Sequence, residues 1–189
     1  MESINILVSF QTSPAQKELI ESSLSKFGTV SYLSDLGLGQ ARSAAIRNAD
    51  VILAWNPPKE FSKDEYAMMQ NARFMQLLSA GADHIPFELL PNDLTVAGNV
   101  GAYAKPMAEH VMAMALALAK NLRSGHERLA QGNFDQFSMN KSLDGAVCAI
   151  LGFGGIGKAT ARLMKAFGAK IYAINTSGKT DEKVDFIGT

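Results

Sequence analysis

The sequence has one cysteine, no excess of either charge and no long apolar run. Cys148 therefore has no partner for a disulfide within the chain, and the N-terminus lacks the basic segment and apolar stretch of a signal peptide. The 18 Lys and Arg residues balance 18 Asp and Glu residues, so no basic field favours nucleic acid or an anionic membrane. The longest strongly apolar stretch, residues 111–119, is shorter than the about 20 residues of a membrane-spanning helix. We expect a soluble, cytoplasmic protein with no nucleic-acid or membrane partner.

Three catalytic signatures are absent as well. The sequence contains no nucleophile elbow, no zinc-ligand spacing and no phosphate-binding P-loop. These three absences disfavour acyl transfer, metal-assisted hydrolysis and phosphoryl transfer, respectively. We therefore expect no metal site.

Short apolar runs alternate with helical patterns in the first half of the chain. Strands are expected at residues 4–10, 30–33, 51–55, 75–79 and 94–97. Because this alternation is typical of a parallel sheet, we predict an α/β fold. A length of 189 residues allows one large domain or two small ones. The turn-rich segment after residue 97 indicates a boundary, which gives domains of residues 1–98 and 99–189.

Capping signals mark the helices of the first half. Ser13 offers an N-cap, Pro14 fits the first helical position, and Gln16 completes a capping box. Gly28 is expected to end this helix, after an apolar stripe of Leu19, Ile20, Leu24 and Phe27. A second capping box, residues 62–65, precedes Tyr66, Met69 and Ala72. Residues 40–48 give a weaker helical pattern.

The second half begins with a long apolar helix. Residues 107–120 carry apolar side chains on every face, and such a helix is normally buried. We interpret it as a strut between domains or subunits. Residues 121–142 have no clear periodicity beyond a short helix, and we interpret them as an arm.

A glycine motif follows a buried-strand pattern at residues 146–151. Gly152, Gly154 and Gly157 match G-x-G-x-x-G, and a helix and a second strand at residues 170–174 are predicted after them. Gly152 allows a tight turn, Gly154 lets the backbone approach a pyrophosphate, and Gly157 lets the helix pack close to the strand. The spacing predicts a dinucleotide-binding Rossmann unit. The alternative is a glycine-rich turn that binds nothing.

The helix after the motif supplies further expected contacts. The amides of Gly155 and Ile156 lie at the positive end of its dipole and are expected to hold phosphate oxygens. Gly168 is expected to end the helix. Its inner face is expected to carry Ile156, Ala159, Leu163, Met164 and Phe167.

The end of the second strand bears on the choice of cofactor. Dinucleotide folds usually place an acidic residue here to bind the adenosine ribose, whereas this sequence has Asn175. A carboxylate would repel a 2′-phosphate, so its absence favours NADP over NAD. Three nearby residues could donate to that phosphate: Thr176, Ser177 and Lys179. The alternative is an ordinary polar turn with a solvated lysine.

Three segments taken together resemble a known family. They are QLLSAGADHI at residues 76–85, AEH at residues 108–110 and LGFGGIG at residues 151–157. In this order they resemble the D-isomer-specific 2-hydroxyacid dehydrogenases, and the resemblance spans the whole chain. It implies a flavodoxin-like substrate domain, followed by a doubly wound parallel-sheet Rossmann domain that is entered through the long helix and is incomplete in this chain.

The resemblance also implies site residues and partners. The amides of Ala80 and Gly81 would bind the substrate carboxylate, and the loop with Trp55 and Asn56 would line the pocket. The implied substrate is a small D-2-hydroxy acid or 2-keto acid, as in glyoxylate or hydroxypyruvate reductases and phosphoglycerate dehydrogenase, with NADP or NAD as cofactor. Family members commonly form homodimers through the helix, here residues 106–121, and the following arm.

The family's catalytic arginine, glutamate and histidine are expected beyond Thr189, so no catalytic residue is assigned. His84 stands where many members carry Asn, and we interpret it, His110 and His126 as structural, with Cys148 inert. A sheet that ended after residues 170–174 would leave residues 146–151 as an unpaired apolar edge. We therefore expect a part of a longer protein, inactive by itself.

Two other interpretations stay open at this point. A non-catalytic dinucleotide sensor or corepressor-like member of the family would keep the glycine motif and change its partner surface. A naturally short, inactive remnant is the third. The discriminating feature is whether arginine, glutamate and histidine follow Thr189.

Overall fold

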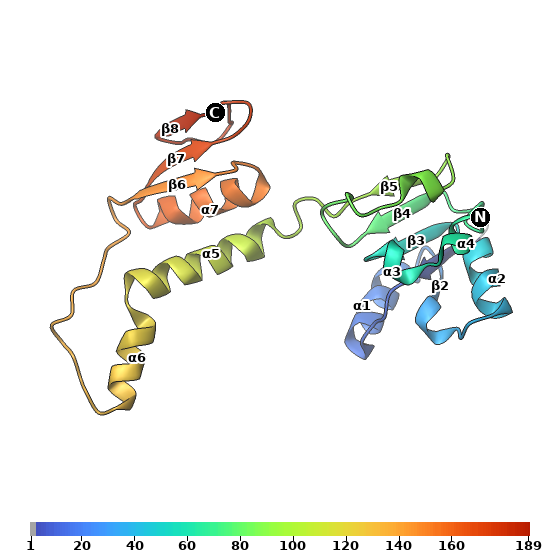
Figure 1. Ribbon diagram of the computed structural model, residues 1–189, viewed down its shortest axis with the longest axis horizontal. Helices are drawn as coiled ribbons and strands as arrows, with labels where there is room; N and C mark the ends of the chain where they lie inside the picture. Colours follow the sequence, from blue (N-terminus) through green and yellow to red (C-terminus); the bar gives the residue numbers. More distant parts are fainter. Residues whose placement is uncertain (1–2) are drawn as a thin grey trace. The chain divides into compact units, whose positions relative to one another are not determined.

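The computed structural model describes residues 3–189. These residues divide into two compact units, of which the first ends at Val100 and the second runs from Gly101 to Thr189 (Figure 1). The division falls in the turn-rich segment in which the sequence indicates a boundary. Each unit contains its own parallel sheet, as the α/β prediction requires.

The sheet of the first unit places β1 at its centre. Within the described residues the strand order is β2-β1-β3-β4-β5, and all pairings are parallel. This order is the flavodoxin-like one, which confirms the predicted fold class. The strands are β1 (Ile4–Val8), β2 (Gly28–Tyr32), β3 (Val51–Ala54), β4 (Phe74–Leu77) and β5 (Thr95–Ala97).

Short helices connect these strands. They are α1 (Pro14–Leu24), the 3-10 turn η1 (Leu33–Asp35), α2 (Gln40–Asn48), α3 (Pro57–Glu60), α4 (Lys63–Tyr66) and the 3-10 turn η2 (Phe87–Leu89). Strands that are buried on both faces need apolar neighbours. The core of the first unit therefore contains apolar side chains from both its strands and its helices. Its fully buried large side chains include Leu7, Leu33, Ile46, Ile52, Met69, Met75 and Leu77.

The capping boxes at Ser13 and Ser62 are both present, and Tyr66, Met69 and Ala72 are buried as predicted. The predicted role of Gly28 is wrong, because α1 already ends at Leu24 and Gly28 begins β2. A Cβ at this position would lie 1.9 Å from the carbonyl oxygen of Ile4, so the close approach of β1 and β2 requires the glycine.

The apolar stripe of α1 is not buried as a whole. Leu19 is 67% exposed and Phe27 is 59% exposed, while Ile20 and Leu24 are half-buried. The described part of the chain therefore covers only part of this apolar stripe.

The second unit contains a shorter parallel sheet of order β6-β7-β8 within the described residues. The prediction that the sheet ends after residues 170–174 is wrong, because β8 pairs beyond that strand. Strand β6 is an edge of this sheet, as expected. The elements are α5 (Ala104–Ala119), α6 (Leu122–Ala130), β6 (Val147–Leu151), α7 (Gly155–Ala166), β7 (Lys170–Ile174) and β8 (Phe186–Gly188).

The long apolar helix is less buried than the sequence predicts. Helix α5 begins at Ala104, ahead of Pro106, and packs on one side against α7. Only Ala108 and Met112 of α5 are buried, and Leu118 is 79% exposed. The reason is geometric: within this unit one helix covers one side of α5, so Val111, Ala115 and Leu116 are half-buried, while Met107, Met114 and Leu118 are exposed.

The predicted inner face of α7 needs a similar correction. Met164 is buried, but Ile156 and Phe167 are 44% and 46% exposed, and Thr160 and Ala161 are buried in their place. The face is rotated relative to the expected one, because α7 packs against both α5 and the sheet. Gly168 ends the helix with φ +80, as predicted.

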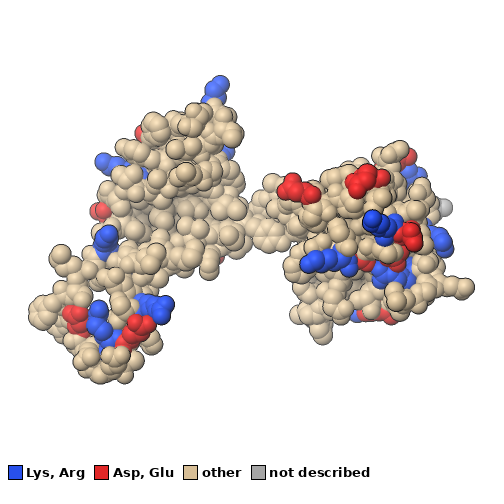
Figure 2. Space-filling model, in the orientation of Figure 1, with Lys and Arg blue, Asp and Glu red and all other residues tan. Residues whose placement is uncertain are grey.

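Charged side chains of both signs lie on the surface of the described residues (Figure 2). On the face drawn in Figure 2, lysines and arginines lie interspersed with aspartates and glutamates. No helix among residues 3–189 has both the length and the apolarity to cross a membrane.

Candidate functional site

The glycine motif forms the turn between β6 and α7. Gly152 has φ +92, a left-handed conformation that favours glycine, and its amide donates to the carbonyl of Ile174 at 2.9 Å. A Cβ on Gly157 would lie 2.4 Å from the carbonyl oxygen of Gly152. The tight turn and the close helix-to-strand packing are therefore present at the two predicted glycines.

The first turn of α7 presents backbone amides without side-chain caps. Gly154 is the N-cap residue, and no side chain bonds to the amides that follow it, including those of Gly155 and Ile156. The first amides of a helix have no acceptor within the helix. A Cβ on Gly154 would meet no atom within 4 Å, so the space in front of this residue is open. Amides and space together fit an anionic group such as a pyrophosphate.

A hollow of about 540 Å³ joins the motif to the end of β7. It brings the first two motif glycines together with Asn175, Thr176 and Ser177, as the sequence predicts for a dinucleotide site. Phe153 and Thr189 also line it and were not predicted. Phe153 is buried, and the only sequence signal for it is that an apolar residue lies inside the glycine motif. The lining residues are Gly152, Phe153, Gly154, Ile174, Asn175, Thr176, Ser177 and Thr189.

Asn175 is used within its own turn. Its side-chain nitrogen donates to the carbonyl of Lys179 at 2.8 Å, and its side-chain oxygen accepts from the amide and the hydroxyl of Ser177, both at 3.1 Å. The turn after β7 is thereby held in one shape. Asn175 and Ser177 line the hollow with side chains that already have local partners.

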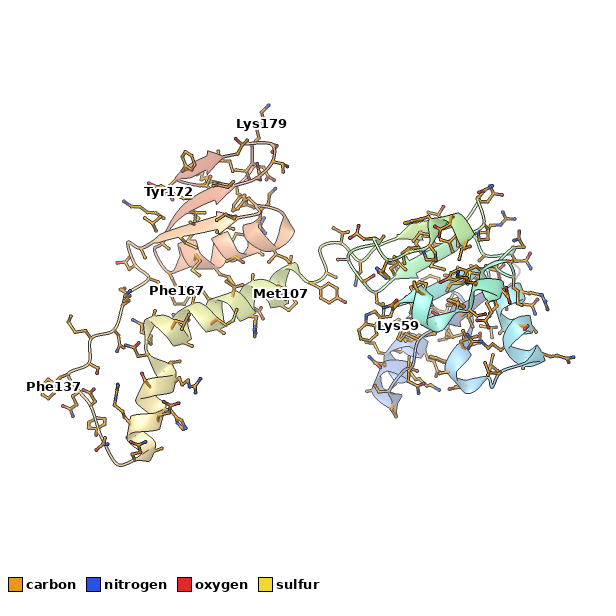
Figure 3. All side chains as sticks on the ribbon, in the orientation of Figure 1. Lys59, Met107, Phe137, Phe167, Tyr172 and Lys179 are labelled. Atoms are coloured by element: carbon orange, nitrogen blue, oxygen red, sulfur yellow. The ribbon has the colours of Figure 1, made fainter. Side chains whose placement is uncertain are left out.

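Lys179 lies outside the lining of this hollow. Its side chain projects from the loop after β7 (Figure 3), and it has no ion pair among the described residues. Two cations of α7 are paired: Lys158 with Asp181, and Arg162 with Glu182. Lys158 lowers the pKa of Asp181, chiefly through its hydrogen bond. Lys179 is therefore a cation of this loop still available to a ligand.

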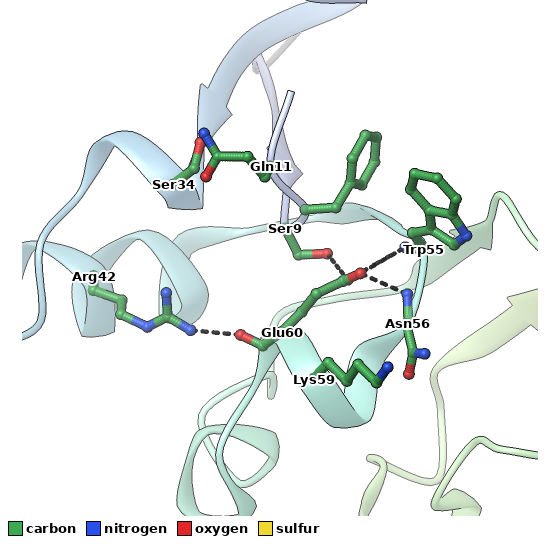
Figure 4. A pocket seen from close by; sticks show the side chains of 9 residues that line it. Ser9, Gln11, Ser34, Arg42, Trp55, Asn56, Lys59 and Glu60 are labelled. Carbon is green, nitrogen blue, oxygen red and sulfur yellow. Dashed lines mark hydrogen bonds between the residues drawn. The ribbon is translucent and has the colours of Figure 1, made fainter. Parts of the chain in front are cut away.

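The predicted substrate residues of the first unit follow β3 and β4. Trp55 and Asn56 line a second hollow of about 570 Å³ at the carboxyl ends of the strands (Figure 4). The ring of Trp55 contacts that of Phe10 edge to face, with centroids 6.2 Å apart. The lining residues are Ser9, Phe10, Gln11, Ser34, Arg42, Trp55, Asn56, Lys59 and Glu60.

Ala80 and Gly81 follow the neighbouring strand, β4. Both residues are exposed, and among residues 3–189 neither amide donates to another protein group. The loop is fixed by Ser79, whose hydroxyl donates to the carbonyl of Gly81 at 2.9 Å. Free amides on a fixed loop can receive a carboxylate. The 570 Å³ hollow does not include these two residues, so the structure places the two predicted substrate groups on adjacent strand ends without joining them in one pocket.

The three histidines and the cysteine that we interpret as structural do not form a metal-binding or catalytic cluster within the described residues. His84, His110 and His126 are exposed, and no group of three or more potential metal ligands occurs within residues 3–189. Cys148 is half-buried, and burial raises the pKa of its thiol. A raised thiol pKa fits the expectation that this cysteine is unreactive.

Comparison with known proteins identifies the family. Residues 112–189 match the D-isomer specific 2-hydroxyacid dehydrogenase, NAD binding domain. A crystal structure of a glycerate dehydrogenase related protein from Thermoplasma acidophilum is 29% identical with a TM-score of 0.72, over 96% of this chain and 57% of that one. The chain belongs to the D-isomer specific 2-hydroxyacid dehydrogenase family. The resemblance found in the sequence is confirmed.

Two further relatives illustrate the range of this family. Formate dehydrogenase 1 of Saccharomyces cerevisiae is 27% identical over 131 residues, which are 66% of this chain and 35% of the yeast protein. A D-lactate dehydrogenase of Aquifex aeolicus, crystallised with NAD and lactic acid, shares the fold at 21% identity and a TM-score of 0.69, over 93% of this chain and 52% of that one. The chain spans about a third to just over half of the length of these relatives.

Proposed function

We propose that the intact protein is an NADP- or NAD-dependent oxidoreductase that interconverts a small 2-keto acid and a D-2-hydroxy acid. The observation that carries this proposal is the hollow that joins the glycine turn, directly ahead of the uncapped amides of α7, to the turn after β7. The bound dinucleotide would supply or accept the hydride. The residues described in this chain would hold the cofactor and orient the acid.

We propose that NADP is the preferred cofactor. Position 175 carries no carboxylate to repel a 2′-phosphate, and the unpaired ammonium of Lys179 lies on the same loop. Thr176 is exposed beside them and lines the hollow. The match to an NAD-binding domain supports a nicotinamide dinucleotide in general, and the local charge favours its phosphorylated form.

For the acid, we propose that the free amides of Ala80 and Gly81 bind its carboxylate and that Trp55 and Asn56 limit its size. With NADPH as donor, reduction of glyoxylate or hydroxypyruvate is the favoured direction, and a phosphoglycerate dehydrogenase-like substrate is the other possibility within the class. The names of the relatives, which include formate dehydrogenases and a glycerate dehydrogenase related protein, support a small carboxylic acid.

We also propose a cytoplasmic homodimer formed through α5 and the arm. The apolar residues that α5 leaves exposed support this, together with Phe137 and Met139 of the arm, which are 91% and 92% exposed. Figure 3 shows Phe137 at the outer end of the arm. The single cysteine supports the cytoplasmic setting.

The test is an assay of the intact protein with NADPH or NADH and a series of 2-keto acids, followed by the loss of reduced-cofactor absorbance. Turnover of one of them, abolished by Gly154→Val, is expected. A non-catalytic sensor or corepressor-like protein is the second candidate, because the cofactor elements would serve either function. It predicts dinucleotide binding in a direct titration and no turnover with any acid.

A further inference from the structure

Glu60 lines the 570 Å³ hollow, and its carboxylate is turned toward the loop after β3 (Figure 4). The carboxylate accepts the amide of Asn56 at 2.5 Å and the amide of Trp55 at 3.2 Å. It also accepts the hydroxyl of Ser9, at the end of β1, at 2.7 Å. One side chain therefore fixes the backbone of both residues predicted to line the substrate pocket.

A second set of contacts fixes Glu60 itself. Arg42 of α2 donates to the backbone carbonyl of Glu60 at 2.6 Å. The guanidinium is held in turn by Glu65 of α4, through contacts of 2.5 and 3.1 Å. The side chains of Arg42 and Glu65 are only 15% and 13% exposed. Paired charges shielded from water in this way form a stiff support.

These contacts show that the two charged groups of Arg42 and Glu60 already have partners within the protein. The guanidinium of Arg42 is already paired with Glu65, and the carboxylate of Glu60, which lines the hollow, is already hydrogen-bonded. The side chains of Arg42 and Glu60 are therefore engaged with other groups of the protein rather than with a ligand.

The ring of Trp55 has little else to orient it. It is 53% exposed, and its ring contact is the edge-to-face one with Phe10. The backbone hydrogen bonds to Glu60 thus set the direction of the side chains at positions 55 and 56. Charge-assisted hydrogen bonds of this kind are stronger than neutral ones.

We propose that Glu60 is a positioning residue for substrate recognition, which acts by holding the Trp55–Asn56 loop in the conformation that lines the substrate pocket. This inference rests on the proposed function, because it assigns that loop to the substrate. The sequence carries no signal for Glu60, since its partners come from the residue after β1 and the loop after β3.

The experiment compares Glu60→Gln with the unmutated intact protein. The amide keeps the size of the side chain and removes its charge, so the KM for the 2-keto acid is expected to rise about tenfold, with kcat changed much less. Acrylamide should quench Trp55 fluorescence more readily, with Trp55→Phe supplying the background. Dinucleotide affinity should stay unchanged, because the dinucleotide is assigned to the second unit.

Two further variants make the result decisive. Glu88→Gln changes an exposed glutamate of the same unit without a described hydrogen bond, and it should leave KM and quenching unchanged. Ser9→Ala removes one donor to the carboxylate and should raise KM about two- to threefold; it carries the test if Glu60→Gln does not fold. If Glu60→Gln shows a normal KM and normal quenching, the inference is overturned, and turnover still upholds the proposed function. If only Ser9→Ala folds, the same two measurements on that variant decide the inference. Absence of turnover in the unmutated protein would overturn both.

Discussion

The side-chain oxygen of Asn175 accepts two hydrogen bonds from Ser177, one from its amide and one from its hydroxyl. The side-chain nitrogen of Asn175 bonds to Lys179, so one amide group spans the whole turn after β7. A polar residue at this position thus has a structural task whether or not a ribose lies beside it. Tests of cofactor choice have to separate these two contributions.

Asn175→Asp should lower the affinity for NADP about tenfold or more relative to NAD. The carboxylate would repel a 2′-phosphate, and it would also face the carbonyl of Lys179 without a proton to donate. Direct titration of the intact protein with both dinucleotides measures the ratio. If the unmutated protein already binds NAD more tightly than NADP, the interpretation of this loop as a phosphate site is wrong.

Lys179→Ala should weaken NADP binding and leave NAD binding nearly unchanged, because the ammonium would contact only the additional phosphate. Lys183→Ala is the matched control, since Lys183 is an exposed lysine of the same loop region without an ion pair among the described residues. Its removal should change neither affinity. Equal effects of both variants would point to a general charge effect instead of a defined contact.

Two glycines of the motif should respond differently to a side chain. Gly154→Val places atoms in open space, so the fold should persist while most dinucleotide affinity is lost. Gly157→Ala places a Cβ 2.4 Å from a backbone oxygen and should lower the melting temperature. Circular dichroism and titration of both variants separate fold from binding. Unchanged titration of Gly154→Val would mean that the turn has a structural role only.

The Arg42–Glu65 pair predicts how the stability of the first unit depends on pH. Hydrogen bonding to Arg42 holds the pKa of Glu65 below its usual value of 4.5. A lowered pKa in the folded state stabilises the fold above the unfolded-state pKa, and this contribution is lost as the pH falls through the folded-state pKa. Glu65→Gln should therefore cost about 1.5 to 3 kcal/mol at neutral pH.

Urea unfolding measures this cost, and the difference between Glu65→Gln and the unmutated protein should shrink on acidification below about pH 4.5. Asp64→Asn changes the neighbouring exposed carboxylate and should have a small effect throughout. A cost of Glu65→Gln that stayed constant with pH would argue against the ion pair as its source.

Ala80 and Gly81 should contact the substrate carboxylate through their amides. A crystal of the intact protein soaked with glyoxylate, or with oxamate as a nonreactive mimic, is expected to place carboxylate oxygens about 2.7 to 3.2 Å from these nitrogens. The motivation is that neither amide has a partner within residues 3–189. Density for the acid elsewhere would remove this assignment.

Local signals account for most of what the sequence predicted correctly. The capping box of Ser13, the bounds of α2 and the strand of residues 170–174 all follow from neighbouring residues, and all agree with the structure. The glycine motif was predictable for the same reason, because its turn and its close packing involve residues 152–157 alone.

What the sequence could not provide depends on distant partners. Strand β8 is short, and it forms because Asp185 bonds to the backbone of Ile171 and β7 offers a free edge. Glu60 acquires its role from two amides of the loop after β3 and the hydroxyl of Ser9, which directly follows β1. The local bonds of Asn175 were equally invisible, since the sequence does not show how a turn closes.

The strand pairings of the first sheet all lie between Ile4 and Ala97, ahead of the second unit in the chain. During synthesis the ribosome therefore releases every strand of that sheet before it makes β6. We expect the first unit to fold while the second is still being translated, as N-terminal domains generally do. The apolar edge of β6 is then made after the strands of the first sheet have paired with one another, which shortens the time in which two sets of unpaired strands could pair wrongly.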